Sequence, residues 1–321
     1  GRADLEHGKA PTMKKALLAP LVAVTVVLVI VYFFFPGLTL ALAERAELVA
    51  AGLERGEIDV AGHHVVYLSG GSGEPVVLLH GFSAEKNNWV RVARYLTAHV
   101  RVIAPDLPGF GESTRDPNAR YGTAEQVERV RAFVQALGLR SFHLGGNSMG
   151  GQIAAVYAAK YPGEVKSLWL LAPGGIASAE KSELQELFEK GENPFAFDDA
   201  EGFDRLLRFA FVEVPPIPGP VKRHLARRAL ADQAFNEKIA KELQEGFEPL
   251  EPKLRDLQVP TLVVWGDQDR LLHVSGAAVL GSILPKSRVV VMKNVGHVPM
   301  LERPEESARE FLRFQGFEPP A

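Results

Sequence analysis

Two hydrophobic patterns divide this chain near residue 57. Before that point, Ala16 to Phe35 is an uncharged run of twenty mostly apolar residues, and an amphipathic stretch follows it. After that point, short apolar runs alternate with stretches of helical spacing, as in strands joined by helical crossovers. The pattern predicts an α/β fold with a mostly parallel sheet flanked by helices, preceded by an N-terminal helical segment.

The apolar runs define the expected strands and the amphipathic stretches define the expected helices. The strands are predicted at His63 to Leu68, Val76 to His80, Val102 to Asp106, Phe142 to Gly146, Ser167 to Ala172, Thr261 to Gly266 and Arg288 to Met292. The helices are predicted at Trp89 to Leu96, Ala124 to Leu137, Met149 to Tyr161, Gly276 to Leu284 and Glu305 to Phe314.

One region, residues 176–254, interrupts this alternation. It has no convincing strand pattern but four helical stretches rich in Phe and Leu, broken by the proline-rich segment Val214 to Pro220. We interpret it as a helical cap inserted into the α/β core, which is thereby divided into residues 57–175 and 255–321. The phenylalanines of the cap either line an apolar tunnel or fill the core of the cap itself.

The N-terminal apolar run has the length of a membrane anchor. As a helix, Ala16 to Phe35 would be about 30 Å long, close to the hydrocarbon thickness of a bilayer. Lys14 and Lys15 precede the run and the aromatic residues Tyr32 to Phe35 close it, as expected of a cytoplasmic flank and an interfacial belt. We expect a single-pass transmembrane anchor over residues 13–37, with the N-terminus in the cytoplasm.

A cleavable signal peptide is the alternative interpretation of this segment, because Ala41-Leu42-Ala43 has the form of a cleavage site. In a bacterial cell, either interpretation places the following domain on the periplasmic side of the inner membrane. Residues 1–12, before Met13, resemble an expression leader and are excluded from the fold prediction.

A juxtamembrane amphipathic helix is predicted over residues 38–56. Five apolar residues fall on one helical stripe there: Leu38, Leu42, Ala46, Val49 and Leu53. The stripe could lie on lipid, pack on the following domain or pair with a second copy of the chain. Ala19 and Ala23 form a small-xxx-small pair that favours helix pairing. A homodimer through both helices is therefore a hypothesis, which crosslinking in native membranes can test.

Composition excludes several kinds of chemistry. The chain has 46% hydrophobic residues, enough for a sizeable core, and a formal net charge of -3 without a basic stripe. Nucleic acid is therefore not expected as a partner. The chain has no Cys, which excludes disulfides, thiolate catalysis and Cys-ligated zinc.

The strongest local motif is Gly146-Asn-Ser148-Met-Gly150, between an apolar strand and an apolar helix. A G-x-S-x-G sequence in this context holds the serine on a sharp turn where its hydroxyl protrudes, and the glycines prevent collisions with neighbouring backbone. A serine hydroxyl needs a base to accept its proton, and the base needs an orienting carboxylate. Ser148 is therefore the candidate nucleophile.

Candidates for the acid and the base follow two later strands. Asp269 ends the string Trp265-Gly-Asp-Gln-Asp269, in which Asp267 is a competing acid. His297 lies in a loop before the last helix, whereas other histidines lie in strands or too close to the acid loop. We assign Asp269 and His297 to the triad.

Two backbone amides are candidates for an oxyanion hole, which stabilises the negative charge of a tetrahedral intermediate. The amide of Met149 starts the helix after the nucleophile, and that of Phe82 lies in His80-Gly-Phe82, directly after a strand. His80 is expected to brace this loop.

Together these motifs resemble the α/β-hydrolase superfamily from about residue 57 to residue 316. The resemblance rests on His80-Gly-Phe, Asp106-Leu-Pro-Gly-Phe-Gly-Glu-Ser113, the serine motif, the acid string, Gly296-His297 and the order Ser, Asp, His. With the anchor, and with Leu272-His-Val-Ser-Gly-Ala277 and Leu301-Glu-Arg-Pro304, the chain looks most similar to animal membrane-bound monoacylglycerol lipases and to bacterial inner-membrane phospholipases A. The resemblance implies hydrolysis of fatty-acyl esters in membrane lipids, with fatty acid as product and with no metal or other cofactor.

Two other functions compete with this one. Carbon–carbon bond hydrolases of ring-fission products share the Gly-Asn-Ser-Met-Gly-Gly motif, but they carry a glycine-rich stretch where Phe82-Ser-Ala-Glu-Lys86 stands here. A lipid-binding pseudoenzyme would have no need of the complete triad. The headgroup, the acyl chain and the glycerol position that is cleaved stay open.

Overall fold

The central sheet is mixed but mostly parallel. Within residues 13–317, which the computed structural model describes, eight strands form one sheet in the order β1-β2-β4-β3-β5-β6-β7-β8. Strands β3 to β8 pair in parallel, whereas β2 pairs antiparallel with both β1 and β4. The strands are β1 (Leu53–Val60), β2 (His63–Gly70), β3 (Pro75–Leu79), β4 (Arg101–Pro105), β5 (Phe142–Ser148), β6 (Val165–Pro173), β7 (Thr261–Gly266) and β8 (Ser287–Met292). All the predicted strands are present, and β1 was not predicted.

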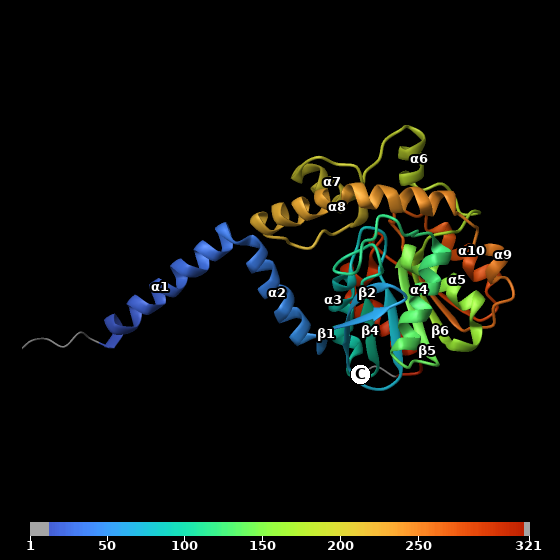
Figure 1. The fold of residues 1–321 in the computed structure, drawn as a ribbon, viewed down its shortest axis with the longest axis horizontal. Helices are drawn as coiled ribbons and strands as arrows, with labels where there is room; N and C mark the ends of the chain where they lie inside the picture. The colour runs from blue at the N-terminus through green and yellow to red at the C-terminus, as the bar shows by residue number, and fades with distance from the viewer. Residues whose placement is uncertain (1–12, 318–321) are drawn as a thin grey trace, which may run out of the picture.

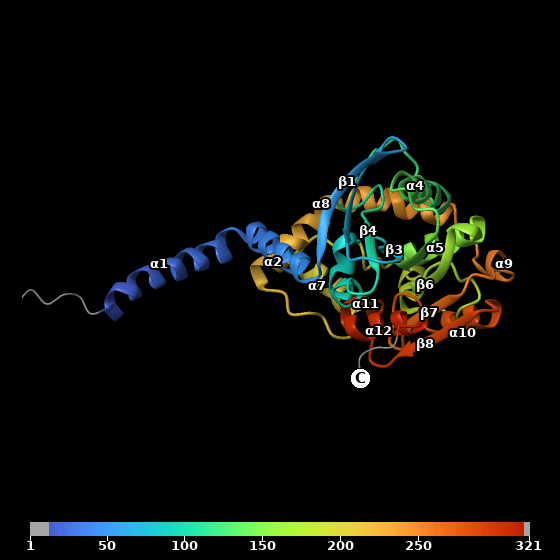
Figure 2. The ribbon, with the colours of Figure 1, turned by 90° about the horizontal axis from the view of Figure 1, so that it is seen from below.

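Helices cover both faces of the sheet (Figures 1 and 2). Its central strands, such as β3 and β7, are therefore buried on both sides. One hydrophobic cluster joins α4 (Thr123–Ala136), α5 (Met149–Lys160) and α10 (Ser275–Ile283) to the sheet. The other joins α3 (Val90–Leu96) and α12 (Pro304–Phe314) to it, and there Phe311 stacks on Trp169 with 4.7 Å between ring centres. A short 3-10 turn (Lys86–Trp89) precedes α3, and α11 (Pro299–Glu302) precedes α12. The five predicted helices are confirmed.

Four helices lie between β6 and β7: α6 (Glu183–Glu189), α7 (Ala200–Ala210), α8 (Gly219–Glu245) and α9 (Glu251–Leu254). Figure 1 shows α6, α7 and α8 together at one end of the sheet, with α8 running across it. Residues 176–254, all of them described, contain no strand. Below, the segment from α6 to α8 is called the inserted helices.

The two N-terminal helices lie differently with respect to the body of the molecule. Helix α1 (Met13–Phe34) projects away from it and α2 (Pro36–Ala50) returns along its side (Figures 1 and 2). Among the described residues, no single helix is apolar over a length that would cross a bilayer, although Ala23–Phe34 and α2, bent by 106°, meet that test together. The anchor and the homodimer stay predictions, and residues 1–12, the predicted leader, lie outside the described residues.

The boundary of the predicted juxtamembrane helix was wrong. Helix α2 ends at Ala50, Gly52 has a φ of +64°, and Leu53 begins β1 instead of continuing the helical stripe. The stretch from Leu53 to Val60 is held as a strand by antiparallel pairing along β2. The two strands are joined through Ala61 and Gly62, whose φ angles of +51° and +78° are typical of a tight hairpin turn.

Candidate active site

Ser148 lies on a strained turn between β5 and α5. Its φ of +55° and ψ of -119° are sterically unfavourable for a non-glycine residue, at a cost on the order of 1–3 kcal/mol. The turn closes so tightly that a Cβ atom at Gly146 would lie 2.3 Å from the backbone of Gly150. A Cβ atom at Gly150 would lie 2.2 Å from the carbonyl oxygen of Leu79. The two glycines of the motif are therefore required by backbone contacts.

The structure brings Asp269 and His297 together. One carboxylate oxygen of Asp269 lies 2.8 Å from His297 Nδ1, and both side chains are almost fully buried. The other oxygen accepts the backbone N–H groups of Leu271 and Leu272 at 2.9 and 3.0 Å. With Nδ1 held by the carboxylate, Nε2 is the nitrogen left to exchange a proton with a hydroxyl group.

Asp267, the competing acid, has a different place. Its carboxylate accepts the backbone N–H of Asn294 at 2.7 Å, and its other oxygen lies 3.5 Å from Lys293 Nζ. It supports the loop that leads to His297 and does not bond to the imidazole ring.

The serine turn is tied to the histidine loop through Asn147. The amide of Asn147 donates to the carbonyl oxygens of His297 and Leu171, both at 3.0 Å. Among the hydrogen bonds of residues 13–317, none joins Ser148 Oγ to His297 Nε2. In enzymes without bound substrate, the hydrogen bond between the nucleophile and its base is often long or poorly aligned.

The candidate oxyanion donors come from the helix that follows Ser148 and from the loop that follows β3. Met149 is the first residue of α5, so its N–H has no acceptor within the helix. In the loop after β3, a Cβ atom at Gly81, the residue before Phe82, would lie 3.3 Å from Ser148 Cβ. The Phe82 ring packs edge-on against Phe110 of the core and Phe195 of the inserted helices.

His80 braces the Phe82 loop, as the sequence predicted. Its Nε2 accepts the N–H of Leu107 at 3.0 Å, so Nδ1 carries the proton and donates to Gly81 O at 2.8 Å. The side chain is fully buried, and burial lowers the pKa of His80. The imidazole is therefore neutral, with one donor and one acceptor, both used.

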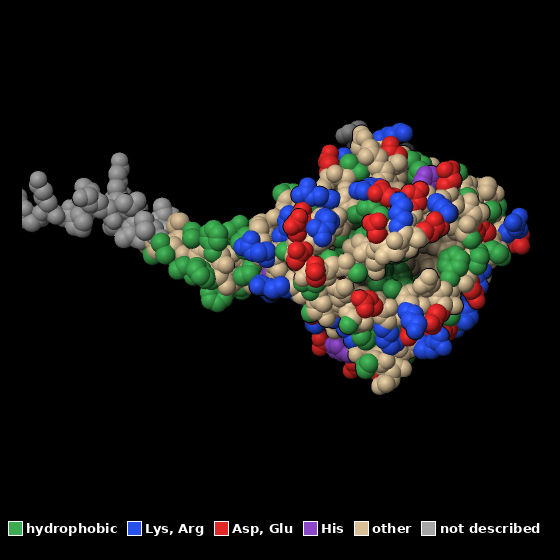
Figure 3. Space-filling model, turned by 90° about the horizontal axis from the view of Figure 1, so that it is seen from above, with side chains coloured by type: hydrophobic (Ala, Val, Ile, Leu, Met, Phe, Trp, Pro, Cys, Tyr) green, Lys and Arg blue, Asp and Glu red, His purple; other side chains and the backbone are tan. Residues whose placement is uncertain are grey.

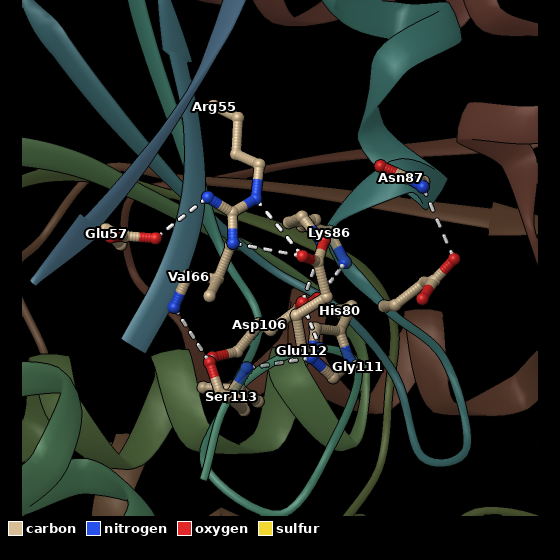
Figure 4. A network of polar contacts seen from close by, with 12 residues as sticks. Arg55, Glu57, Val66, His80, Lys86, Asn87, Asp106, Gly111, Glu112 and Ser113 are labelled. Atoms are coloured by element: carbon tan, nitrogen blue, oxygen red, sulfur yellow. Dashed lines mark hydrogen bonds and ion pairs between the residues drawn. The ribbon is translucent and has the colours of Figure 1, made fainter. Parts of the chain in front are cut away.

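A buried ion pair holds the other end of this loop (Figure 4). Asp106 is inaccessible to solvent and bonds to Lys86 twice, with the backbone N–H at 2.7 Å and with Nζ at 2.8 Å. It also accepts the N–H of Glu112 at 2.8 Å, and Lys86 Nζ lies 2.6 Å from the Glu112 carboxylate. Burial opposes the charge on Lys86, but the two carboxylates raise its pKa. The loop from Gly81 to Lys86 is thus bonded to the loop after β4.

The sequence contained a signal for half of this pair. Asp106 opens the motif Asp106 to Ser113, in which Gly111 is required because a Cβ atom there would lie 2.2 Å from the Asp106 carboxyl carbon. Lys86 had no signal, because a lysine after Ser-Ala-Glu is normally solvated.

A cleft of about 480 Å³ lies beside the acid loop. Its lining comes from the inserted helices and from the residues around Asp269: Glu183, Arg208, Phe211, Val212, Gln268, Asp269, Arg270 and His273. Arg270 forms a two-pronged ion pair with Glu183 at 2.6 Å and lies over the ring of Phe209. The acid loop is thereby bonded to the inserted helices.

The described residues include no group of three or more His, Asp or Glu side chains that could hold a metal ion.

A family model described as the alpha/beta hydrolase fold matches residues 74–211 and 207–304. The chain belongs to the α/β-hydrolase family. Lipase 1 of Psychrobacter immobilis is 37% identical over 79% of this hydrolase and 81% of that protein. Monoacylglycerol lipase abhd6-A of Xenopus laevis is 34% identical over 76% of each chain.

A solved structure extends the likeness to the N-terminal helices. It is that of a membrane phospholipase A described as a bacterial virulence factor, with 46% identity and a TM-score of 0.87. The match covers 94% of this α/β hydrolase and 98% of that chain. The similarity inferred from the motifs is thus confirmed.

Replacing Lys86 with Met in this α/β hydrolase is expected to lower the free energy of unfolding by about 3–5 kcal/mol, because Asp106 is left charged and buried without its partner. Urea unfolding followed by circular dichroism measures the change. Lys181→Met removes a solvent-exposed ion pair with Glu189 and is the matched control, with an unchanged midpoint expected. Equal losses of unfolding free energy in the two variants would show that the buried ion pair stabilises the fold no more than an exposed one.

Proposed function

We propose that this chain is a membrane-anchored serine esterase that hydrolyses fatty-acyl esters of membrane lipids, with glycerophospholipids as the main substrate. Ser148 is the nucleophile, His297 the base and Asp269 the orienting acid. The observation that carries the proposal is the buried Asp269–His297 pair, joined through Asn147 to the strained serine turn.

Acylation begins when Ser148 Oγ attacks the ester carbonyl while His297 Nε2 takes the hydroxyl proton. Asp269 keeps the second proton of the imidazole on Nδ1 and stabilises the imidazolium that forms. The backbone N–H groups of Phe82 and Met149 donate to the oxyanion of the tetrahedral intermediate. His297 then gives its proton to the departing glycerol oxygen, and the acyl group stays on Ser148.

Deacylation repeats these steps with water as the nucleophile. His297 takes a proton from the water, whose oxygen attacks the acyl carbon, and the same two N–H groups again stabilise the oxyanion. The intermediate expels Ser148 Oγ, which regains its proton from His297. The fatty acid leaves and the enzyme is restored.

A lipid substrate is supported by the surroundings of the serine and by the relatives. The inserted helices bring Phe195 onto Phe82, beside the serine turn. Figure 3 looks down on the inserted helices and shows hydrophobic side chains in a hollow near the middle of this face, rimmed by charged groups of both signs. Two of the relatives are named as lipases and one as a membrane phospholipase A. Lysophospholipids and monoacylglycerols are the alternative lipid substrates.

A fluorophosphonate probe tests the serine mechanism. Wild-type protein is expected to be labelled covalently, and Ser148→Ala to lose the label, because the probe reacts only with an activated serine. Mass spectrometry of the labelled peptide identifies the site. A folded wild-type protein that stays unlabelled would support a lipid-binding pseudoenzyme instead.

Two aspartates provide a matched pair of variants, whose kcat is measured with a soluble p-nitrophenyl ester. Asp269→Asn is expected to lower kcat by about 10⁴-fold, because His297 is left in the wrong tautomer. Asp267→Asn makes the same chemical change two residues away and should keep most of the activity. If Asp267→Asn lost more activity than Asp269→Asn, the assignment of Asp269 as the orienting acid would be wrong.

The substrate class is tested with defined lipids. Detergent-solubilised enzyme is incubated with phospholipids, lysophospholipids and monoacylglycerols, and the fatty acid released is measured, with Ser148→Ala as control. Release from intact phospholipids is expected. Hydrolysis of monoacylglycerols alone would contradict phospholipase A activity, and cleavage of a ring-fission product alone would favour a carbon–carbon bond hydrolase.

We also propose that residues 13–37 anchor the enzyme in the bacterial inner membrane, with the catalytic residues on the periplasmic side. Apolar side chains of α1 such as Val27, Phe33 and Phe34 are exposed. Figure 3 shows hydrophobic side chains along the arm that projects from the body of the molecule. A reporter that works only in the periplasm, fused after Ala321, should be active, and a reporter that works only in the cytoplasm should be inactive. The reverse pattern would reject the orientation.

A further inference from the structure

Glu302 is a buried carboxylate at the end of α11, five residues after the catalytic base. Its carboxylate makes no hydrogen bond to Asp269 or Ser148. One oxygen accepts the N–H of Gly296 at 2.8 Å, and the other accepts the N–H groups of Val212 at 2.8 Å and Glu213 at 3.1 Å. The carboxylate thus connects two chain segments that are far apart in the sequence, the base loop and the chain that leaves α7.

The same two segments meet directly at His297. The backbone N–H of His297 donates to Ala210 O at 2.9 Å, at the end of α7. A Cβ atom at Gly296 would lie 2.6 Å from Ala210 O and 3.0 Å from a Glu302 oxygen, so the backbones are in close contact. Residues 210–213 and the base loop therefore form one junction, in which the Glu302 carboxylate accepts three of the four hydrogen bonds.

A carboxylate suits this position because all its hydrogen bonds come from backbone N–H groups. Three N–H groups converge on two acceptor oxygens, and hydrogen bonds to a charged acceptor are about twice as strong as neutral ones. Burial raises the pKa of Glu302, and the three N–H groups act against that rise. An amide in its place would turn an NH₂ group towards at least one N–H and leave a buried donor without an acceptor.

We propose that Glu302 is a positioning residue for the hydrolytic reaction: it holds Gly296 and His297 so that the imidazole stays aligned between Asp269 and Ser148, and it ties this alignment to the end of α7. The proposal rests on the proposed role of His297 as the base. Because α7 belongs to the inserted helices, one side chain sets the position of the base and that of a segment beside the cleft. Displacement of a catalytic group by about 1 Å can lower the rate about 100-fold.

The first test compares Glu302→Gln with Glu305→Gln. Both remove one negative charge, but Glu305 is exposed, at the start of α12, and stands outside the junction. With a soluble p-nitrophenyl ester, E302Q is expected to lower kcat by about 10- to 100-fold and to change KM by no more than about threefold. The rate of fluorophosphonate labelling at Ser148 should fall in parallel, and E305Q should match the wild type in all three quantities.

Two further variants test the junction from its other side, and they decide the question if E302Q does not fold. Glu213→Pro removes the N–H that donates to Glu302, whereas Glu213→Ala removes the exposed side chain and keeps that N–H. E213P is expected to have a kcat several-fold below that of E213A, at an equal melting temperature.

The outcomes separate the two proposals. If wild-type Ser148 is labelled and folded E302Q keeps kcat within about twofold, the positioning role is wrong and the serine mechanism stands. If E302Q does not fold and E213P equals E213A, the positioning role is also wrong. An unlabelled wild type would overturn the serine mechanism, and the positioning role with it.

Discussion

The geometry of the site depends on one backbone contact, between Gly150 at the start of α5 and the carbonyl oxygens of Leu79 and His80 at the end of β3. A Cβ atom at Gly150 would lie 2.2 and 2.5 Å from these oxygens, so no other residue fits. The contact presses the start of α5 onto the neighbouring strand. As a result, the serine turn and the loop from Gly81 to Lys86, which come from different strands, lie next to each other.

Around this contact, the loops at the same edge of the sheet are held by buried carboxylates that accept backbone N–H groups. Asp106 accepts those of Lys86 and Glu112 and so holds the loop from Gly81 to Lys86. Asp269 accepts those of Leu271 and Leu272 and so keeps one oxygen free for His297. Glu302 accepts three and joins the base loop to the inserted helices. In each loop, one carboxylate fixes several backbone N–H groups. An irregular segment held in this way can keep a reacting group in place.

Much of this arrangement could be predicted from the sequence, because glycine requirements and apolar periodicity are local properties. The motif around Ser148 is such a case: its glycines are needed for contacts within a few residues and with the adjacent strand. The buried parallel strands are another, since they read as apolar runs. The pairing of Asp269 with His297 follows from the ends of neighbouring parallel strands lying together.

The sequence failed where a residue takes its role from a distant segment. Strand β1 has a single buried residue, Leu53, and only its pairing with β2 and the Ala61-Gly62 turn make it a strand. In the sequence, the hairpin was indicated only by Ala61-Gly62, which stands between the apolar residues Ile58 and Val60 and the predicted strand that begins at His63. Lys86 and Glu302 look like ordinary surface charges, because burial is decided by Asp106 in one case and by residues 210–213 in the other. A charge pattern along the chain cannot show which charges are enclosed.

We infer that Ser148, His297, Asp269 and the amides of Phe82 and Met149 act on one tetrahedral intermediate. A crystal structure of the wild-type enzyme after reaction with an alkyl fluorophosphonate tests it most directly, since the phosphonyl group mimics that intermediate. Phosphorus is expected to be bonded to Ser148 Oγ, with the phosphoryl oxygen about 2.7–3.1 Å from both amide nitrogens. His297 Nε2 is expected to face Oγ, while Nδ1 stays bonded to Asp269. An adduct on another residue, or a phosphoryl oxygen that contacts neither amide, would contradict the claim.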